Sequence, residues 1–350
     1  GLIVMDSGYV YALAFSVKGR LLGRRDLEEL ASSKSVEDFV AALRATHYFE
    51  ALTSLPQRPN ARVVERALWS HLYRYHVRLL RLTGWSPVLW ALYERHLFRA
   101  MKALVRGMAS RLPQEDLMRE VDTTAAELVE ERDVFARALA SRDFQELLGS
   151  VRGTRFEGPV SKALALYERT GDPAAIDLEF DREAAAGFTR AIGRLRGWDR
   201  RWLAWAFEWH LNSLAVETVL RGKEWGFEQA ELRRAIEGIR FTVPRQVLEV
   251  LLESKDVDEV SRALQLIEGR SVPRISARSS YGEMAGELRE RGWRSAVERF
   301  RKLYLTSVSH LVLAVGSLML LEEEVRKLAG ICAGIELGMP KNRLLEAIAI

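Results

Sequence analysis

The side chains most often used in catalysis and metal binding are few in this sequence, and their spacing fits no familiar catalytic or metal-binding pattern. The two nearest histidines, His71 and His76, are five residues apart, which places them about 140° apart around a helix. A helical metal pair instead needs two histidines four residues apart. Phosphate-binding, dinucleotide-binding and nucleophile-elbow motifs are also missing. We therefore expect no catalytic residue, no cofactor and no metal ion.

Two further reactive groups have simple structural interpretations. Cys332 is the only cysteine, so it cannot form an internal disulfide, and its apolar neighbours predict a reduced, buried thiol in a cytoplasmic compartment. The acidic run Glu322–Glu324 follows a long apolar segment. We expect this run to form a solvated or interface-facing turn of a helix rather than an acid–base pair.

Four tryptophans step by four, three and four residues along one predicted helix: Trp198, Trp202, Trp205 and Trp209. This spacing places their indoles on one stripe, and we expect the stripe to pack in the core. The alternative is a partner-binding face, because tryptophan is enriched at interface anchors. Stacking on nucleic acid is a weaker interpretation, since only Arg200 and Arg201 supply basic neighbours.

The composition predicts that these residues are positioned by a large helical core. Of 350 residues, 48% are apolar and 29% charged, while 24 glycines and 9 prolines leave little material for a loop-rich β architecture. The 52 basic and 48 acidic side chains give a net charge of only +4, so no nucleic-acid partner is required. The longest apolar stretch, Leu305–Leu321, is interrupted by serines and a histidine. It predicts a buried helix rather than a membrane span.

An internal repeat gives the strongest signal in the sequence. A helix-capping residue followed three positions later by an acid marks a predicted helix start in each copy, at Ser35, Asp143 and Asp256. Helical periodicity follows each of these caps. The first two copies continue alike, as Leu43-Arg-Ala-Thr-His-Tyr48 and Val151-Arg-Gly-Thr-Arg-Phe156. This recurrence predicts three repeats of one helical unit.

A second landmark closes each predicted unit. We expect a long helix to end at Gly107, Gly222 and Gly334, with each glycine in the left-handed conformation that terminates helices. A leucine follows each glycine ten positions later. The predicted fold is therefore all-α, with three pseudo-symmetric units over residues 1–120, 121–235 and 236–350.

Several segments resemble the C subunit of archaeal-type (A/V-type) rotary ATP synthases, which is related to the d subunit of vacuolar ATPases. The segments that carry the resemblance are Tyr9–Ala12, Lys18–Leu22, Val151–Val160, Tyr167–Pro173, Ile176-Asp177, Phe180–Arg182, Ala103–Gly107, Thr218–Lys223 and Gly338–Pro340. They are distributed over essentially the whole chain. The resemblance implies a non-catalytic, funnel-shaped component of the central stalk.

In such an assembly, the resemblance implies a peripheral position on the cytoplasmic face of the membrane, without a membrane span. The implied partners are the D and F subunits of the central shaft, received in the hollow of the funnel, and the proteolipid rotor ring below it. A helical-repeat adaptor that binds protein or RNA is the alternative interpretation. It differs by predicting an open superhelix rather than units closed about an axis.

Five charged residues are candidates for the partner interface. Arg106 and Arg221 stand immediately before equivalent glycines and are candidates to line the socket or its rim. The alternative is that each simply complements the negative end of its helix. Arg152, Arg155 and Glu157 surround a turn and form either a polar contact or a solvated helix end.

Overall fold

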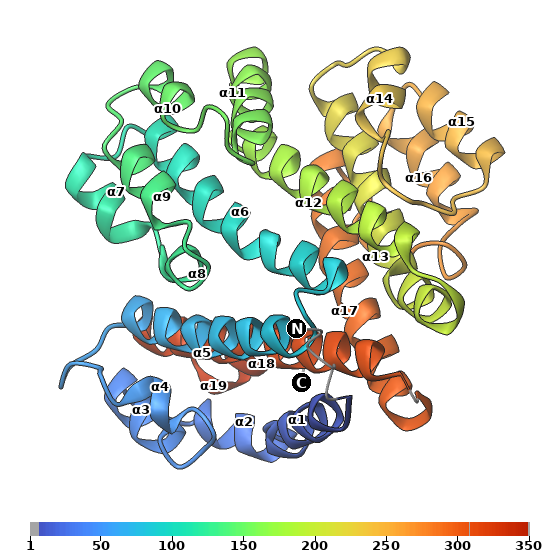
Figure 1. The fold of residues 1–350 in the computed structure, drawn as a ribbon. Coiled ribbons are helices and arrows are strands. Elements are labelled where there is room, and N and C mark those ends of the chain that lie inside the picture. Colours follow the sequence, from blue (N-terminus) through green and yellow to red (C-terminus); the bar gives the residue numbers. More distant parts are fainter. Residues whose placement is uncertain (1–6, 308, 349–350) are drawn as a thin grey trace. The chain divides into compact units, whose positions relative to one another are not determined.

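A computed structural model describes residues 7–307 and 309–348 as a series of helices joined by turns and loops (Figure 1). The pairing of Glu268 with Val272 is an isolated bridge, and the described residues form no strand. The all-α class predicted from composition and periodicity is confirmed.

The helices form two compact units. The first contains the described residues up to Leu89, a short segment Glu127–Val129, and those from Leu303 onward. Its helices are α1 (Ser7–Arg20), α2 (Arg24–Leu30), α3 (Val36–Leu43), α4 (Phe49–Leu52), α5 (Ala61–Leu82), α18 (His310–Glu336) and α19 (Lys341–Ala347). Helix α18 is central, because α5, α1, α3 and α19 all pack against it. Its apolar composition therefore reflects burial on nearly every face.

The second unit comprises residues 90–126 and 130–302. Its helices are α7 (Gln114–Glu120), α9 (Arg132–Leu139), α10 (Phe144–Ser150), α11 (Glu157–Thr170), α12 (Ala174–Arg194), α13 (Gly197–Glu224), α14 (Gln229–Ala235), α15 (Arg245–Glu253) and α16 (Val257–Gln265), with most of α6 (Pro87–Ala109), α8 (Thr124–Glu127) and α17 (Tyr281–Thr306). Phe98 and Phe135 both pack against Phe156, with ring centroids 6.0 and 5.3 Å from it. This aromatic cluster forms part of the core between α6, α9 and α11.

The three predicted caps are confirmed. The Ser35 hydroxyl accepts a hydrogen bond from the Asp38 amide (3.1 Å), and the carboxylates of Asp143 and Asp256 accept equivalent bonds of 2.8 Å. In the second and third copies the following acid reaches back one residue further than expected. Glu146, for example, accepts from the backbone amide of the residue before its cap (2.9 Å). Each cap satisfies amides at a helix start that have no partner within the helix.

The first two copies also share the turn after this helix. The Thr46 and Thr154 hydroxyls each donate to the carbonyl three residues earlier, at 2.6 Å in both cases. Tyr48 and Phe156 follow at the same position and are fully buried. The shared sequence ending therefore corresponds to a shared local structure.

The prediction that the three landmark glycines are left-handed is wrong. Gly107, Gly222 and Gly334 lie inside their helices, which continue for two more residues. The left-handed residue comes four positions later in every copy, at Arg111, Gly226 and Gly338, with φ of 56°, 74° and 70°. A left-handed helix stop and a close contact between helices both favour glycine near the end of a helix. The sequence pattern therefore did not distinguish the two roles.

The glycines are instead required by a close approach between helices. A Cβ atom at Gly107, Gly222 or Gly334 would lie 2.4, 2.3 or 2.0 Å from a methyl carbon of the leucine ten residues later. These leucines lie in α7, α14 and α19, each seven residues long. Each glycine carbonyl also accepts from the amide five residues on, at 3.0, 2.8 and 2.9 Å, as in a Schellman motif. We call this arrangement the glycine–leucine turn, and it occurs three times.

The predicted single helix over Leu305–Leu321 is wrong at its start. Helix α17 ends at Thr306 and α18 begins at His310, while Val308 lies outside the described residues. Ser309 caps α18 by accepting from the Val312 amide (3.2 Å), which explains why the apolar run is divided at its serines. From Leu311 onward the predicted burial is confirmed.

Candidate functional site

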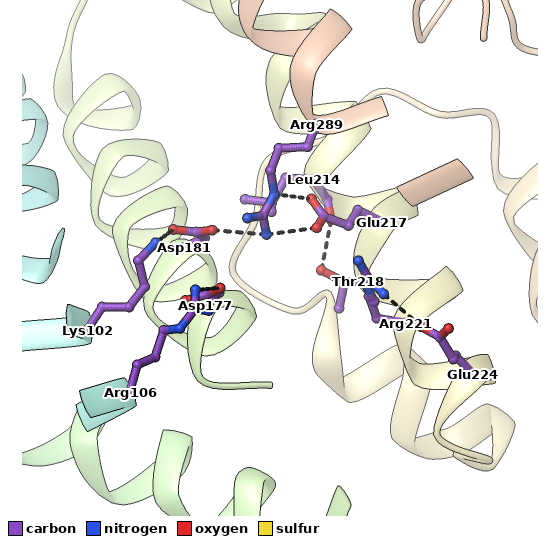
Figure 2. A network of polar contacts seen from close by, with 10 residues as sticks. All are labelled: Lys102, Arg106, Asp177, Asp181, Leu214, Glu217, Thr218, Arg221, Glu224 and Arg289. Atoms are coloured by element: carbon purple, nitrogen blue, oxygen red, sulfur yellow. Dashed lines mark hydrogen bonds and ion pairs between the residues drawn. The ribbon is translucent and has the colours of Figure 1, made fainter. Parts of the chain in front are cut away.

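A network of charged side chains joins α6, α12, α13 and α17 within the second unit (Figure 2). Lys102 and Arg106 lie one turn apart on α6 and face Asp181 and Asp177, which lie one turn apart on α12. The Lys102 Nζ atom is 3.2 Å from Asp181 Oδ1, and Arg106 Nη1 is 2.6 Å from Asp177 Oδ2. Two successive ion pairs therefore hold the last turns of α6 against α12.

Arg289 on α17 extends this network to α13. Its guanidinium lies 3.0 Å from Asp181 and 2.7 Å from Glu217, whose side chain is only 2% exposed. Burial alone would raise the pKa of Asp181, but Lys102 and Arg289 hold it below its ordinary value. Burial raises the pKa of Glu217 by more than Arg289 offsets. The pKa of Arg289, which burial would lower, is raised by the two carboxylates.

Lys102 and Glu217 occupy the same position in successive copies, five residues before the landmark glycine. Each forms an ion pair with a neighbouring helix, but the charges are exchanged: Lys102 pairs with Asp181, whereas Glu217 pairs with Arg289. The sequence reasoning missed these four residues. The sequence signal for Lys102 and Glu217 was their common distance from the landmark glycine. Their partners lie 72 to 79 residues away, so this local signal could not identify them.

The two predicted helix-end arginines take part in ion pairs inside this unit. Arg106 is half exposed and pairs with Asp177, while Arg221 is 21% exposed and lies 2.8 Å from Glu224. Figure 2 shows both arginines at the edge of the same network. Their position fits a structural role, and the predicted interface role stays a prediction.

The other three predicted residues lie at the turn between α10 and α11. Arg155 bridges Glu94 (2.7 Å) and Glu131 (2.9 Å), and its guanidinium covers the ring of Trp90. Burial raises the pKa of Glu94 in spite of Arg155. This arginine therefore fixes the turn to α6.

Its two neighbours at this turn point elsewhere. Glu157 accepts from the Gly153 amide (2.8 Å), and Arg152 is exposed and forms no ion pair with any residue in 7–307 or 309–348. Arg152 is thus the most accessible of the five predicted residues. No ion pair in the described part of the chain joins this turn to the arginines at positions 106 and 221, and the partners of each are different. The five candidates therefore do not form one charged cluster.

A second polar cluster lies inside the first unit and corrects the prediction for Glu322–Glu324. Glu324 is buried and accepts hydrogen bonds from Tyr48 Oη (2.8 Å), the Leu22 amide (2.5 Å) and His47 Nε2 (2.8 Å). Glu322 is buried as well and pairs with Arg326 (2.7 Å). The acidic run is therefore not solvated. The partners of Glu324 lie more than 270 residues away in the sequence, where local sequence patterns cannot reveal them.

Two of the histidines in this unit are adjacent in space. His47 Nδ1 and His71 Nε2 lie 3.2 Å apart. Burial, with contributions from His47 and Arg20, lowers the pKa of His71 to about 4. Burial and the Glu324 carboxylate raise the pKa of Tyr48. The cluster thus holds a neutral His71 next to His47, which in turn contacts the buried Glu324 carboxylate. Cys332 is buried too, as predicted, and burial raises its pKa to about 12.

The tryptophan stripe is not part of the core, contrary to expectation. Trp198 is 63% exposed, and the other three tryptophans are only partly buried. The buried face of this part of α13 is formed by Leu203, Ala206 and Phe207. Because α13 has apolar residues on several faces, the spacing of the tryptophans did not reveal which face is inside.

The sequence matches the model of the ATP synthase (C/AC39) subunit family over residues 10–347. The chain belongs to this family. It is 27% identical to the C subunit of the A-type ATP synthase of Pyrococcus abyssi, over 97% of this chain and 89% of the relative. It is 25% identical to the protein of the same name from Pyrococcus horikoshii, over 97% of this chain and 89% of the relative. It is also 25% identical to the protein of that name from Methanothermobacter thermautotrophicus, over 71% of this chain and 62% of the relative. The resemblance inferred from the sequence is confirmed at the level of the family.

No helix within residues 7–307 and 309–348 is both long and apolar enough to cross a bilayer. The same residues contain no group of three or more His, Cys, Asp or Glu side chains arranged to hold a metal ion.

Proposed function

We propose that this chain is a non-catalytic central-stalk component of a rotary A/V-type ATP synthase or ATPase. In this role it is a socket on the cytoplasmic face of the membrane that couples the central shaft, formed by the D and F subunits, to the proteolipid ring. Membership of the family and the relatives named as the C subunit of A-type ATP synthases support the assignment. Catalysis then resides in other parts of the complex.

The observation that carries this proposal is the threefold glycine–leucine turn. Three copies of one glycine, one left-handed residue and one leucine, with matching backbone hydrogen bonds, indicate three related helical units. Like units repeated about an axis enclose a central opening, and an opening coaxial with a ring transmits torque without chemistry of its own. We assign these units to residues 1–120, 121–235 and 236–350.

A coupling element must also resist twisting, and the charged network supports this requirement. Arg289 connects α17 to both α12 and α13 through two carboxylates, and Lys102 connects α6 to α12. Removing one member of a buried ion pair is costly, so the helices are held in one arrangement. The network therefore links parts of successive predicted units.

Within the proposed interface, the five predicted residues have different roles. Arg152 is exposed and free of ion pairs within the described ranges, so it is available to a partner. Arg155 and Glu157 shape the turn that presents it. Arg106 and Arg221 lie half or mostly covered beside the network, where a partner would meet them only at its rim.

Binding measurements with the purified chain test this function. We expect the chain to bind both a D–F shaft complex and a detergent-solubilised proteolipid ring, and to hydrolyse no ATP. Charge reversal at Arg152 (Arg152→Glu) is expected to weaken one of these interactions about tenfold, while Arg132→Glu, at another exposed position, on α9, leaves both unchanged.

A folded chain that binds neither partner would contradict the proposal. RNA binding that weakens steeply with salt would support the adaptor interpretation instead.

A further inference from the structure

The turn between α12 and α13 concentrates positive charge around an exposed indole. We call residues Arg194–Arg201 the α12–α13 tip. Its four arginines are all exposed, and none forms an ion pair with a residue in the described part of the chain: Arg194, Arg196, Arg200 and Arg201. Trp198 stands among them with 63% of its surface exposed. With Asp199 as the one acid in this segment, the tip carries a formal net charge of +3 (four arginines minus one aspartate). Other arginines of this unit, such as Arg155, Arg169, Arg278 and Arg289, face carboxylates.

The aromatic rings at the tip are held in place. Trp198 and Trp202 stack with centroids 6.1 Å apart and an angle of 17° between their planes. The Arg201 guanidinium lies over both rings, at 5.4 and 5.9 Å. These contacts occupy ring faces that a nucleic-acid base would need for stacking. Trp198 nevertheless remains largely exposed.

A groove beside the tip provides a seat for an anion. Its volume is about 340 Å³, and Arg200, Arg201 and Arg240 all line it. Arg240 also forms no ion pair within the described ranges, and the single carboxylate in the lining belongs to Glu208. That carboxylate already accepts from Thr242 Oγ1 (2.8 Å) and lies 3.3 Å from Arg299. Three guanidiniums therefore face the groove without a matching negative charge.

We propose that the α12–α13 tip binds the anionic headgroup surface of a phospholipid bilayer. Trp198 would enter the interfacial region, where the indole places its apolar body and its polar N–H in suitable surroundings. The arginines at the tip would contact the surrounding phosphates, and the groove would receive one headgroup phosphate. Positive charge spread over the tip matches a broad anionic surface, whereas a protein partner needs a complementary pocket for Trp198.

This inference does not depend on the proposed coupling function, because the chain alone is expected to bind lipid. Binding of the purified full chain to vesicles tests it, with sedimentation or flotation to measure the bound fraction. Vesicles of phosphatidylcholine alone are compared with vesicles containing 30% phosphatidylglycerol, a fraction of about one lipid in three. We expect partitioning into the anionic vesicles only, and weakening as salt is raised.

Two tip variants and two matched controls locate the contact. The first variant, Arg196→Gln combined with Arg200→Gln, is expected to reduce partitioning about 30-fold, on the order of fivefold for each arginine. The second variant, Trp198→Ala, is expected to reduce partitioning on its own, because it removes the indole that enters the interface. The controls are Arg132→Gln with Arg137→Gln, on the exposed face of α9, and Leu266→Ala, where the leucine is 57% exposed. Both controls should bind like the parent chain.

The proposal is overturned if the folded chain ignores anionic vesicles, or if the tip and control variants bind them equally. Tighter tip-dependent binding to a single-stranded oligonucleotide than to the vesicles would also overturn it and assign the tip to nucleic acid. Circular dichroism of every variant confirms that the comparison is made between folded proteins.

Discussion

Leu232 packs so closely on Gly222 that a Cβ atom added to the glycine would lie 2.3 Å from the leucine Cδ2 atom. The leucine is almost completely buried, so it has little room to move aside. The same relationship recurs in the other two glycine–leucine turns. The internal repeat of this chain is therefore a repeat of packing as well as of helix boundaries.

Substitution of this glycine tests the packing directly. Gly222→Ala is expected to lower the free energy of unfolding by about 1–3 kcal/mol, because the new methyl group overpacks the contact. Gly286→Ala is the matched control: this glycine also lies in a helix, but nothing stands within 4 Å of an added Cβ. It should stabilise the protein by about 0.5–1 kcal/mol. Equal effects of the two changes in urea denaturation would refute the close approach.

The helix caps give a second prediction. Asp256→Ala is expected to cost about 1 kcal/mol, because the Glu259 amide loses its acceptor at the start of α16. Asp258→Ala changes an exposed acid in the same first turn, which accepts no cap hydrogen bond, and should cost less than half as much. Thermal unfolding of the two variants distinguishes capping from a general effect of negative charge.

The charged network gives a third prediction. Glu217→Gln is expected to destabilise by about 2–4 kcal/mol, because Arg289 loses the buried one of its two carboxylate partners. Glu224→Gln breaks the more exposed pair with Arg221, and its effect should stay within about 0.5 kcal/mol. If denaturant midpoints place both variants at the same stability, the network does not hold the helices together.

His71 predicts a dependence of stability on pH. Its pKa is about 4 in the folded chain and about 6.5 when unfolded, so the unfolded state binds the proton first as the pH falls. Stability contributed by neutral His71 is therefore complete above pH 6.5 and is lost between pH 6.5 and 4. Between pH 7 and 5 the parent chain should lose about 1–2 kcal/mol more than His71→Gln. Parallel stability curves for the two proteins would show that His71 is not the group responsible.

Features encoded by neighbouring residues were predictable from the sequence. The caps at Ser35, Asp143 and Asp256 depend on contacts over three residues, and helical periodicity depends on the next turn. The leucine ten residues after each landmark glycine was also visible. The structural reason for this spacing could not be predicted, because a helix stop and a close contact between helices both favour glycine.

Features that depend on distant partners were not predictable. Glu324 was expected in a solvated or interface-facing turn. Its burial could not be predicted, because its partners His47 and Tyr48 are about 280 residues earlier in the chain. Arg106 was chosen as a candidate from its place before a glycine, but nothing local indicated Asp177, 71 residues later, as its partner. For the site, the sequence supplied candidate positions, and the pairing of charges required the fold.

A density map of the assembled rotary complex tests the coupling function most directly. The account predicts that the chain lies on the rotation axis between the end of the shaft and the proteolipid ring, with residues 1–120, 121–235 and 236–350 arranged around that axis. A chain bound at the periphery of the complex, or three segments extended in an arc without a central opening, would contradict it.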